Sequence, residues 1–146
     1  MSPACDLNLQ RLDHDLRISS HIKTHDPKGV ADWFGTAFGF EIVIDAERAS
    51  GDRIIRCALG ANQPPFIVIT SPVPGQDLPE GRTHQSLGLE HFALTTDDVP
   101  AAADRLVELG AVLVDGPTTA PDGTVMAFLT VPGDVRIELV HFPTGV

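Results

Sequence analysis

The feature that most constrains the fold is an internal repeat, in which one order of elements occurs twice. Residues 17–70 combine period-two alternation with one helical stretch and predict strand, helix, strand, strand, strand. Residues 91–140 predict the same order again. Two copies are too few for an open solenoid, so we expect two modules packed as a pair. The predicted fold class is α+β, with two βαβββ modules in tandem.

A stretch rich in Pro and Gly separates the two halves and shows no periodicity, which indicates a linker. We therefore expect one domain over residues 1–146. Within it, module one spans about residues 16–71, the linker about 72–87 and module two about 88–143. A chain of this length can bury a core without disulfide or metal staples.

Charge and cysteine usage limit the partners and the compartment. The formal net charge of −10 argues against nucleic acid and against an anionic membrane surface as partners. The N-terminal segment lacks the pattern of a signal peptide, and no apolar run approaches the ~20 residues of a membrane helix. Cys5 and Cys57 form no CxxC pair, so we expect reduced thiols and a cytoplasmic protein.

The predicted helices carry start and stop signals at matching places in the two halves. Asp26 precedes Pro27, a pattern typical of an N-cap followed by proline in the first turn, and Gly39 ends the helix. In the second half, Asp97 or Asp98 precedes Pro100, and Gly110 ends the helix. These signals support the duplication.

One acid in the second half requires an explanation. Glu138 lies among Ile137, Leu139 and Val140 in a predicted strand, where an unpaired carboxylate would be costly to bury. A 70-residue offset relates His21 to His91 and Val68 to Glu138, so we expect histidine at one equivalent place in both repeats. We therefore predict that His91 and Glu138 bind one metal ion.

These residues resemble those of the vicinal oxygen chelate superfamily, the glyoxalase, bleomycin-resistance and dioxygenase group. The resemblance covers about residues 17–142. It is carried by His21, Asp26-Pro27, Trp33-Phe34, Phe38-Gly39-Phe40, His91 and Glu138. It implies that the two modules form curved mixed sheets around a pocket. It also implies a metal held by side chains from the first and last strand of each module. Carried onto this sequence, those positions are His21, Val68, His91 and Glu138.

Val68 departs from that pattern, because an aliphatic side chain cannot bind a metal. Two histidines and one glutamate leave about three open positions on an octahedral ion, as in non-haem Fe(II) oxygenases. By resemblance, we expect an extradiol-type dioxygenase acting on a small aromatic or oxygenated anionic substrate. Fe(II) is the favoured metal, with Mn(II), Ni(II) and Zn(II) as alternatives. The chain has no Tyr, so Lys23 or His25 would serve as the catalytic acid or base.

Strand alternation assigns a lining to the pocket that is apolar on one wall and cationic on the other. An aromatic or apolar compound with a carboxylate or an acidic hydroxyl would fit it. The predicted substrate-binding residues are Arg56, Phe66, Val68, Met126, Phe128 and Arg136.

Other interpretations stay open. The chain could be a glyoxalase-like or epimerase-like lyase, isomerase or transferase on a small oxygenated metabolite. It could also be a metal-free resistance protein that binds a drug or metabolite. His91 could be a hydrogen-bonded core histidine, and the cationic residues could be surface charges. The resemblance implies a homodimer, with modules paired within one chain or exchanged between two.

Overall fold

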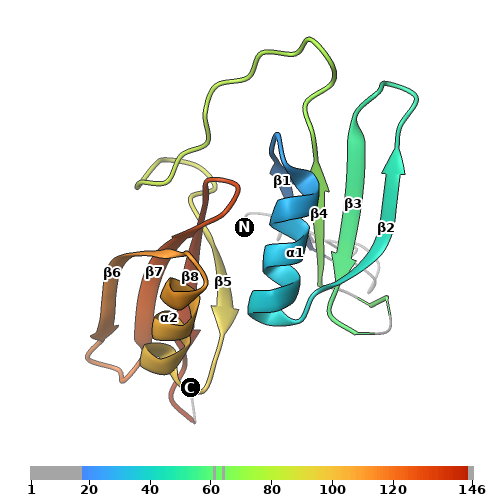
Figure 1. Ribbon diagram of the computed structural model, residues 1–146. Helices are drawn as coiled ribbons and strands as arrows, with labels where there is room; N and C mark the ends of the chain where they lie inside the picture. The colour runs from blue at the N-terminus through green and yellow to red at the C-terminus, as the bar shows by residue number, and fades with distance from the viewer. Residues whose placement is uncertain (1–17, 61, 64, 145–146) are drawn as a thin grey trace, which may run out of the picture.

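A computed structural model of the chain describes residues 18–60, 62–63 and 65–144, and Cys5 lies outside them. Both halves show the expected βαβββ order, which confirms the α+β fold class (Figure 1). Module one consists of β1 (Ser19–Lys23), α1 (Pro27–Phe38), β2 (Glu41–Glu47), β3 (Arg53–Ala58) and β4 (Phe66–Thr70). Module two consists of β5 (Phe92–Thr95), α2 (Val99–Glu108), β6 (Val112–Thr119), β7 (Val125–Val131) and β8 (Val135–His141).

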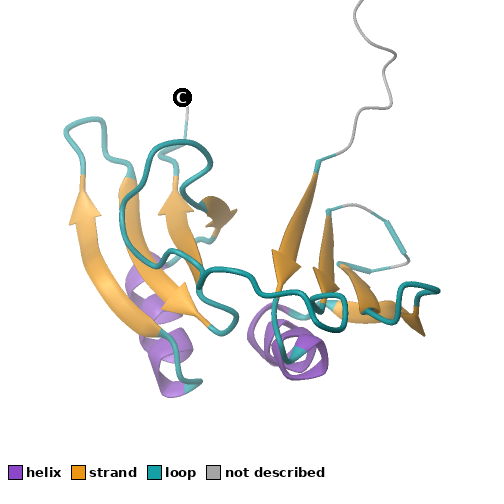
Figure 2. Ribbon diagram, turned by 90° about the horizontal axis from the view of Figure 1, so that it is seen from above, coloured by secondary structure: helices purple, strands orange, loops and turns teal. Residues whose placement is uncertain are grey.

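Each module forms one four-stranded mixed sheet. Sheet A has the order β1-β4-β3-β2, and sheet B has the matching order β5-β8-β7-β6. In both, the first strand pairs in parallel with the last, and the remaining pairs are antiparallel. The helices α1 and α2 lie on the same side of the two sheets, and the linker crosses one end of the molecule (Figures 1 and 2).

The predicted caps set the helix boundaries. The Asp26 carboxylate accepts a hydrogen bond from the Gly29 backbone N–H at 3.0 Å, and Pro27 occupies the first helical position. Asp98 does the same for Ala101, also at 3.0 Å, so Asp98 and not Asp97 is the N-cap of α2. Gly39 ends α1 with φ of 79°, which glycine adopts without steric cost.

Alternation along the strands gives each sheet a helix-facing surface and a surface we term its open face. The helix-facing side chains are buried apolar residues: Ile22, Ile55, Cys57, Ile67 and Ile69 in sheet A, and Ala127, Leu129, Ile137 and Leu139 in sheet B. The residues that alternate with these along each strand lie on the open faces and are polar or half-buried, including Arg56, Val68 and Glu138. Ile137 and Leu139 therefore pack under α2, as the alternation predicts.

The two modules contact each other through their helices. The indole Nε1 of Trp33 donates to the Leu109 carbonyl at 2.8 Å. The guanidinium of Arg105 donates to the carbonyls of Thr36 and Ala37 at 2.9 and 2.6 Å, near the C-terminal end of α1. Buried apolar residues of both modules form one continuous cluster. The side-by-side arrangement thus has both a polar and an apolar basis.

Strand β6 continues through Gly116 and Pro117 to Thr119, and residues 120–123 reverse the chain. β6 is an edge strand, and its pairing with β7 shifts register around these residues. An edge strand can accommodate proline at such irregularities. No helix among the described residues has the length and apolarity needed to cross a bilayer.

Candidate functional site

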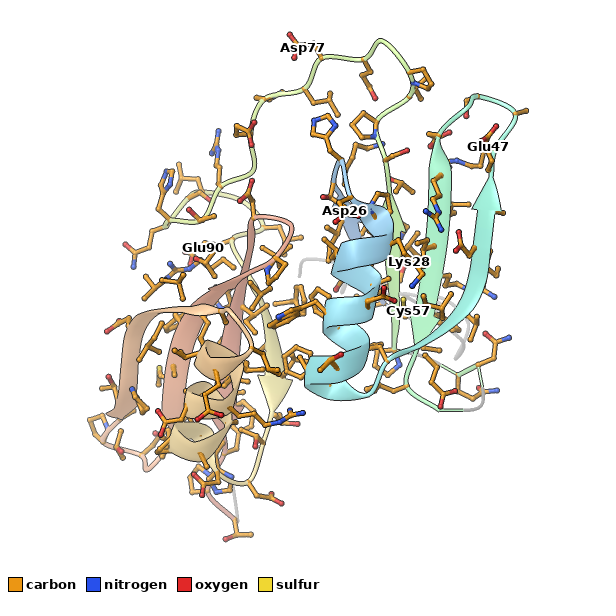
Figure 3. The ribbon with its side chains drawn as sticks, in the orientation of Figure 1. Asp26, Lys28, Glu47, Cys57, Asp77 and Glu90 are labelled. Atoms are coloured by element: carbon orange, nitrogen blue, oxygen red, sulfur yellow. The ribbon has the colours of Figure 1, made fainter. Side chains whose placement is uncertain are left out.

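The strongest polar cluster of module two is formed by Glu90, His91 and Glu138. His91 Nδ1 lies 3.2 Å from Glu90 Oε1, and His91 Nε2 lies 3.1 Å from Glu138 Oε2. All three side chains are partly buried, with exposed fractions of 26%, 29% and 16% in the same order. Glu90 lies where the linker joins module two (Figure 3). Each ring nitrogen of one imidazole therefore faces its own carboxylate.

A neutral imidazole ring cannot donate a hydrogen bond to both carboxylates, so this arrangement requires one additional positive charge. Ionised carboxylates only accept hydrogen bonds, and neutral imidazole has a single N–H donor. His91 can therefore satisfy both Glu90 and Glu138 only as imidazolium, or with another cation between one ring nitrogen and its carboxylate. A proton and a divalent metal ion are the two cations that fit this position.

Neighbouring side chains hold the imidazole in place. The Phe128 ring meets the His91 ring edge-on, with centroids 5.1 Å apart and an interplanar angle of 82°. The guanidinium of Arg136 stacks over the same Phe128 ring, with Cζ 4.9 Å from the ring centroid. Arg136 Nε also lies 2.8 Å from Glu90 Oε1, although it makes no well-directed hydrogen bond there. The Arg136 side chain is only 5% exposed.

A groove of about 520 Å³ runs past this cluster and is shared by the two modules. Its apolar lining includes Ile18, Leu89 and Phe92. Three cationic residues, Lys23, Arg82 and Arg136, outnumber the two acids Glu90 and Asp134 along it. On a protein with a net charge of −10, this is a local reversal of sign that suits a small anion.

The predicted metal-binding and catalytic residues of module one, His21, Lys23 and His25, lie on or near the same groove but stay apart from the cluster. His21 is exposed, lines the groove and pairs its Nε2 with Ser19 Oγ at 2.9 Å. Lys23 also lines the groove, and its Nζ lies 3.5 Å from the Ser71 carbonyl. His25 is exposed and lines an adjoining hollow of about 390 Å³ together with Lys23.

Strand register shows that His21 is not the counterpart of His91. The backbone N–H of Thr24 donates to Thr70 at 2.9 Å, and that of Thr96 donates to Val140 at 3.0 Å in the same way. The first strands are thus related by 96 − 24 = 72 residues, and the last strands by 140 − 70 = 70 residues.

His91 minus 72 is Ser19, so the predicted equivalence of His21 and His91 is wrong by two residues. Val68 remains the counterpart of Glu138, as expected. The helix of module one begins two residues sooner after its histidine, and a constant offset conceals this shift.

The donor set fits a metal ion only in part. His91 Nε2 and Glu138 Oε2 lie at the separation of two neighbouring ligands of one ion, and Glu90 contacts the other ring nitrogen as a carboxylate does in many metal-binding histidines. Glu90 and Glu138 face opposite nitrogens and cannot share an ion with His91. Across residues 18–60, 62–63 and 65–144, no three His, Cys, Asp or Glu side chains converge on one point.

The predicted substrate-binding residues divide between the two open faces. Met126, Phe128 and Arg136 belong to sheet B, and Arg56, Phe66 and Val68 belong to sheet A. Of the six, only Arg136 lines the groove. Glu90 was not predicted, because alternation with His91 would place it on the opposite face. Both residues precede β5, where strand alternation does not yet apply.

Comparison with known proteins gives a consistent family. The model of a family described as a glyoxalase-like domain matches residues 19–138. A glyoxalase family protein from Bacillus cereus has 17% identity, with 86% of this chain and 93% of that chain covered and a TM-score of 0.70. TnmS3, an antibiotic binding protein from Streptomyces sp. CB03234, has 24% identity, coverage of 88% and 96%, and a TM-score of 0.62.

A mutant of glyoxalase I from Zea mays has 20% identity and a TM-score of 0.69, and the alignment covers 87% of this chain and 45% of that one. At such identities these structures establish the shared fold. A search of curated proteins found no match.

Proposed function

The chain belongs to the glyoxalase-like domain family of the vicinal oxygen chelate superfamily, and on this premise we propose that it is a metal-dependent enzyme acting on a small organic anion in the groove. His91 and Glu138 would hold the divalent ion, and oxygens of the substrate and water would complete its coordination. The observation that carries the proposal is the contact of His91 with two carboxylates, which needs a cation beside the ring.

The protein side chains divide the work. Glu90 orients His91 by accepting from Nδ1, and this leaves Nε2 facing Glu138. Arg136 and Phe128 fix Glu90 and the imidazole plane. Lys23 and Arg82 attract the anion, and Lys23 is better placed than His25 to exchange a proton with a bound molecule because it lines the groove itself. A bound divalent ion would supply Lewis acidity, which lowers the pKa of an attached hydroxyl.

The finer proposal is the Fe(II) extradiol dioxygenase, which needs His21 as a third protein ligand beside His91 and Glu138. His21 lines the same groove, and this supports the proposal. A lyase or isomerase reaction needs only proton transfer at a chelated substrate and is compatible with two protein ligands. The two versions differ in whether His21 contributes to metal affinity.

The second candidate function is binding or acid–base chemistry without a metal, in which His91 carries the extra proton itself. One specific observation favours it: the module-one counterparts of His91 and Glu138 are Ser19 and Val68. Serine is a poor metal ligand, and valine cannot bind a metal at all. This version retains the groove and its cationic lining.

Isothermal titration of metal-stripped protein separates these functions. We expect one Mn(II), Ni(II), Zn(II) or anaerobic Fe(II) ion per chain, with affinity lost in His91→Gln and in Glu138→Gln. A further loss in His21→Gln supports the dioxygenase version, and an unchanged affinity supports the two-ligand version. Glu108→Gln, an exposed acid of α2, is the control. Absence of saturable binding, or equal binding by His91→Gln, contradicts the metal proposal.

A further inference from the structure

A hollow of about 210 Å³ lies on the helix side of the sheets, where the C-terminal end of α1 meets β5 and α2 (Figure 1). Module one contributes Ala37 and Phe38 to its lining, and module two contributes the remaining residues. None of the residues that line this hollow also lines the groove beside His91. The hollow is therefore a separate space at the contact between the two modules.

The walls of this hollow are mostly apolar. Its most buried lining residues are Ala37, Leu106 and Leu139, which are 5%, 2% and 2% exposed. Phe38 and Leu94 are half-buried and pack against the hydrophobic core. An apolar cavity of about 150 Å³ holds a benzene molecule, so the hollow has room for one six-membered ring with a small substituent.

Arg105 is the one charged residue among the described residues that line the hollow. Its two terminal nitrogens donate to α1, to the Ala37 carbonyl at 2.6 Å and to the Thr36 carbonyl at 2.9 Å. Because guanidinium N–H groups lie in the plane of the group, these bonds use its edge. Its flat face has no aromatic stacking partner among the described residues. That face remains available to the π face of a ring.

The end of α1 selects against an anion at this place. Thr36 and Ala37 lie in the last turn of α1, where the helix carbonyls carry a partial negative charge. The edge of the Arg105 guanidinium, which would pair with a carboxylate, is already bonded to these carbonyls. The apolar walls, the free face of a cation and the helix carbonyls together favour an uncharged aromatic compound.

We propose that this hollow is a binding site for a neutral, flat aromatic compound, which stacks on the guanidinium face of Arg105 and contacts Phe38 and the leucines of the lining. Such a ligand touches both modules, so its binding stabilises their contact by mass action. The site does not depend on the metal proposed at His91, because the hollow and the groove share no lining residue.

Benzyl alcohol is the probe, and amide chemical shifts in two-dimensional NMR report where it binds. We expect saturable shifts at Phe38, Leu94 and Arg105. Cyclohexylmethanol has a similar shape without a π face, so its affinity should be about two- to fivefold lower. Benzoate, which carries a negative charge, should give no saturable shifts at these residues.

Two substitutions test the site itself. Ala102→Leu fills the hollow from α2 and should abolish the shifts. Ala101→Leu is the matched control, because it adds the same side chain at the neighbouring exposed position of α2, and it should bind benzyl alcohol as the unmodified protein does. Arg105→Lys keeps a charged donor for α1 but lacks the flat face, so affinity should fall by about two- to fivefold. Arg105→Lys and cyclohexylmethanol still decide the matter if Ala102→Leu disturbs the packing of α2.

Four outcomes would overturn the proposal. They are equal affinity for cyclohexylmethanol, saturable benzoate shifts at the same residues, undiminished binding by Arg105→Lys, and shifts centred on Glu90 and His91. Signals of Phe38 and Leu94 that change with protein concentration in the absence of any probe would also contradict it, because they would show that a second copy of the chain covers the hollow.

Discussion

At the scale of single residues, acids are stabilised in two different ways. Asp52 is fully buried in the β2–β3 turn and is bound by Arg48 and Ser50, which makes it a structural acid. Glu90 and Glu138 are partly exposed at the groove and share one imidazole. The second arrangement leaves a position that another cation can take, and this distinguishes a functional acid from a structural one.

Glu90→Gln tests the orienting role assigned to Glu90. The amide cannot hold His91 Nδ1–H and Arg136 as a carboxylate does, so metal affinity should fall by about 10- to 100-fold. The fold should be retained, because Glu90 lies outside the strands. Calorimetric titration with Mn(II) measures the change, with Glu80→Gln in the linker as the control. An affinity within twofold of the unmodified protein would show that Glu90 does not orient His91.

Asp52 predicts a specific pH dependence of stability. Hydrogen bonds from Arg48 and then Ser50 lower the pKa of Asp52 from 3.8 to about 2. Because the folded-state pKa is the lower one, these contacts stabilise the fold fully above an unfolded pKa of about 4, and the contribution disappears as the pH falls towards 2. Asp52→Asn should therefore unfold at lower urea concentration at pH 7.

Urea titrations of Asp52→Asn and the unmodified protein should converge as the pH is lowered through this range. Asp77→Asn, an exposed acid of the linker, should match the unmodified protein at every pH. A gap between Asp52→Asn and the unmodified protein that is the same at pH 7 and at low pH would contradict the assignment.

At the scale of elements, the sequence predicted the order of strands and helices, the caps and the two faces of each sheet. Those features depend on local periodicity and capping, which a single sequence carries. It did not predict the register between modules, because the chain from β3 to β4 is two residues longer than the chain from β7 to β8 (Arg56 to Val68 against Phe128 to Glu138), which alters the equivalence of the first strands without altering the pattern. Ser19 was therefore overlooked as the counterpart of His91, and Glu90 was overlooked because it precedes its strand.

The β7–β8 turn is predicted to be sensitive to a side chain at Gly133. Gly133 has φ of 91°, and a Cβ there would lie 3.3 Å from Ile22 and 3.4 Å from Val30 in module one. Gly133→Ala should cost ~1–2 kcal/mol for the left-handed backbone and more for the contact. Gly110→Ala is the control, because φ is 101° there and no atom lies within 4 Å of the added Cβ. Chemical denaturation that finds the two variants equally stable would show that the turn does not press on module one.

At the scale of the whole molecule, the helices connect the two modules. Trp33 and Arg105 reach across to carbonyl groups of the other module, and the apolar cluster is continuous between them. The groove, which both modules line, depends on this contact. Module association and the shape of the site are therefore linked.

Arg105→Ala tests this link. Loss of two hydrogen bonds from a charged donor to Thr36 and Ala37 should lower the free energy of unfolding by about 1–3 kcal/mol. It should also change the fluorescence of Trp33, which bonds at the same contact. Lys28→Ala removes an exposed pair with Asp32 on α1 and should cost less than about 0.5 kcal/mol. Equal stability of Arg105→Ala and Lys28→Ala would show that the hydrogen bonds of Arg105 do not stabilise the contact between the modules.

The most direct test of the central claim, that a divalent cation lies between His91 and Glu138, is the NMR signal of the His91 ring nitrogens during titration with Zn(II). We predict that Nε2 shifts on metal binding while Nδ1 stays protonated against Glu90, and that Glu138→Gln abolishes the shift. Ring signals that remain those of an imidazolium in excess Zn(II) would contradict the claim and identify the cation as a proton.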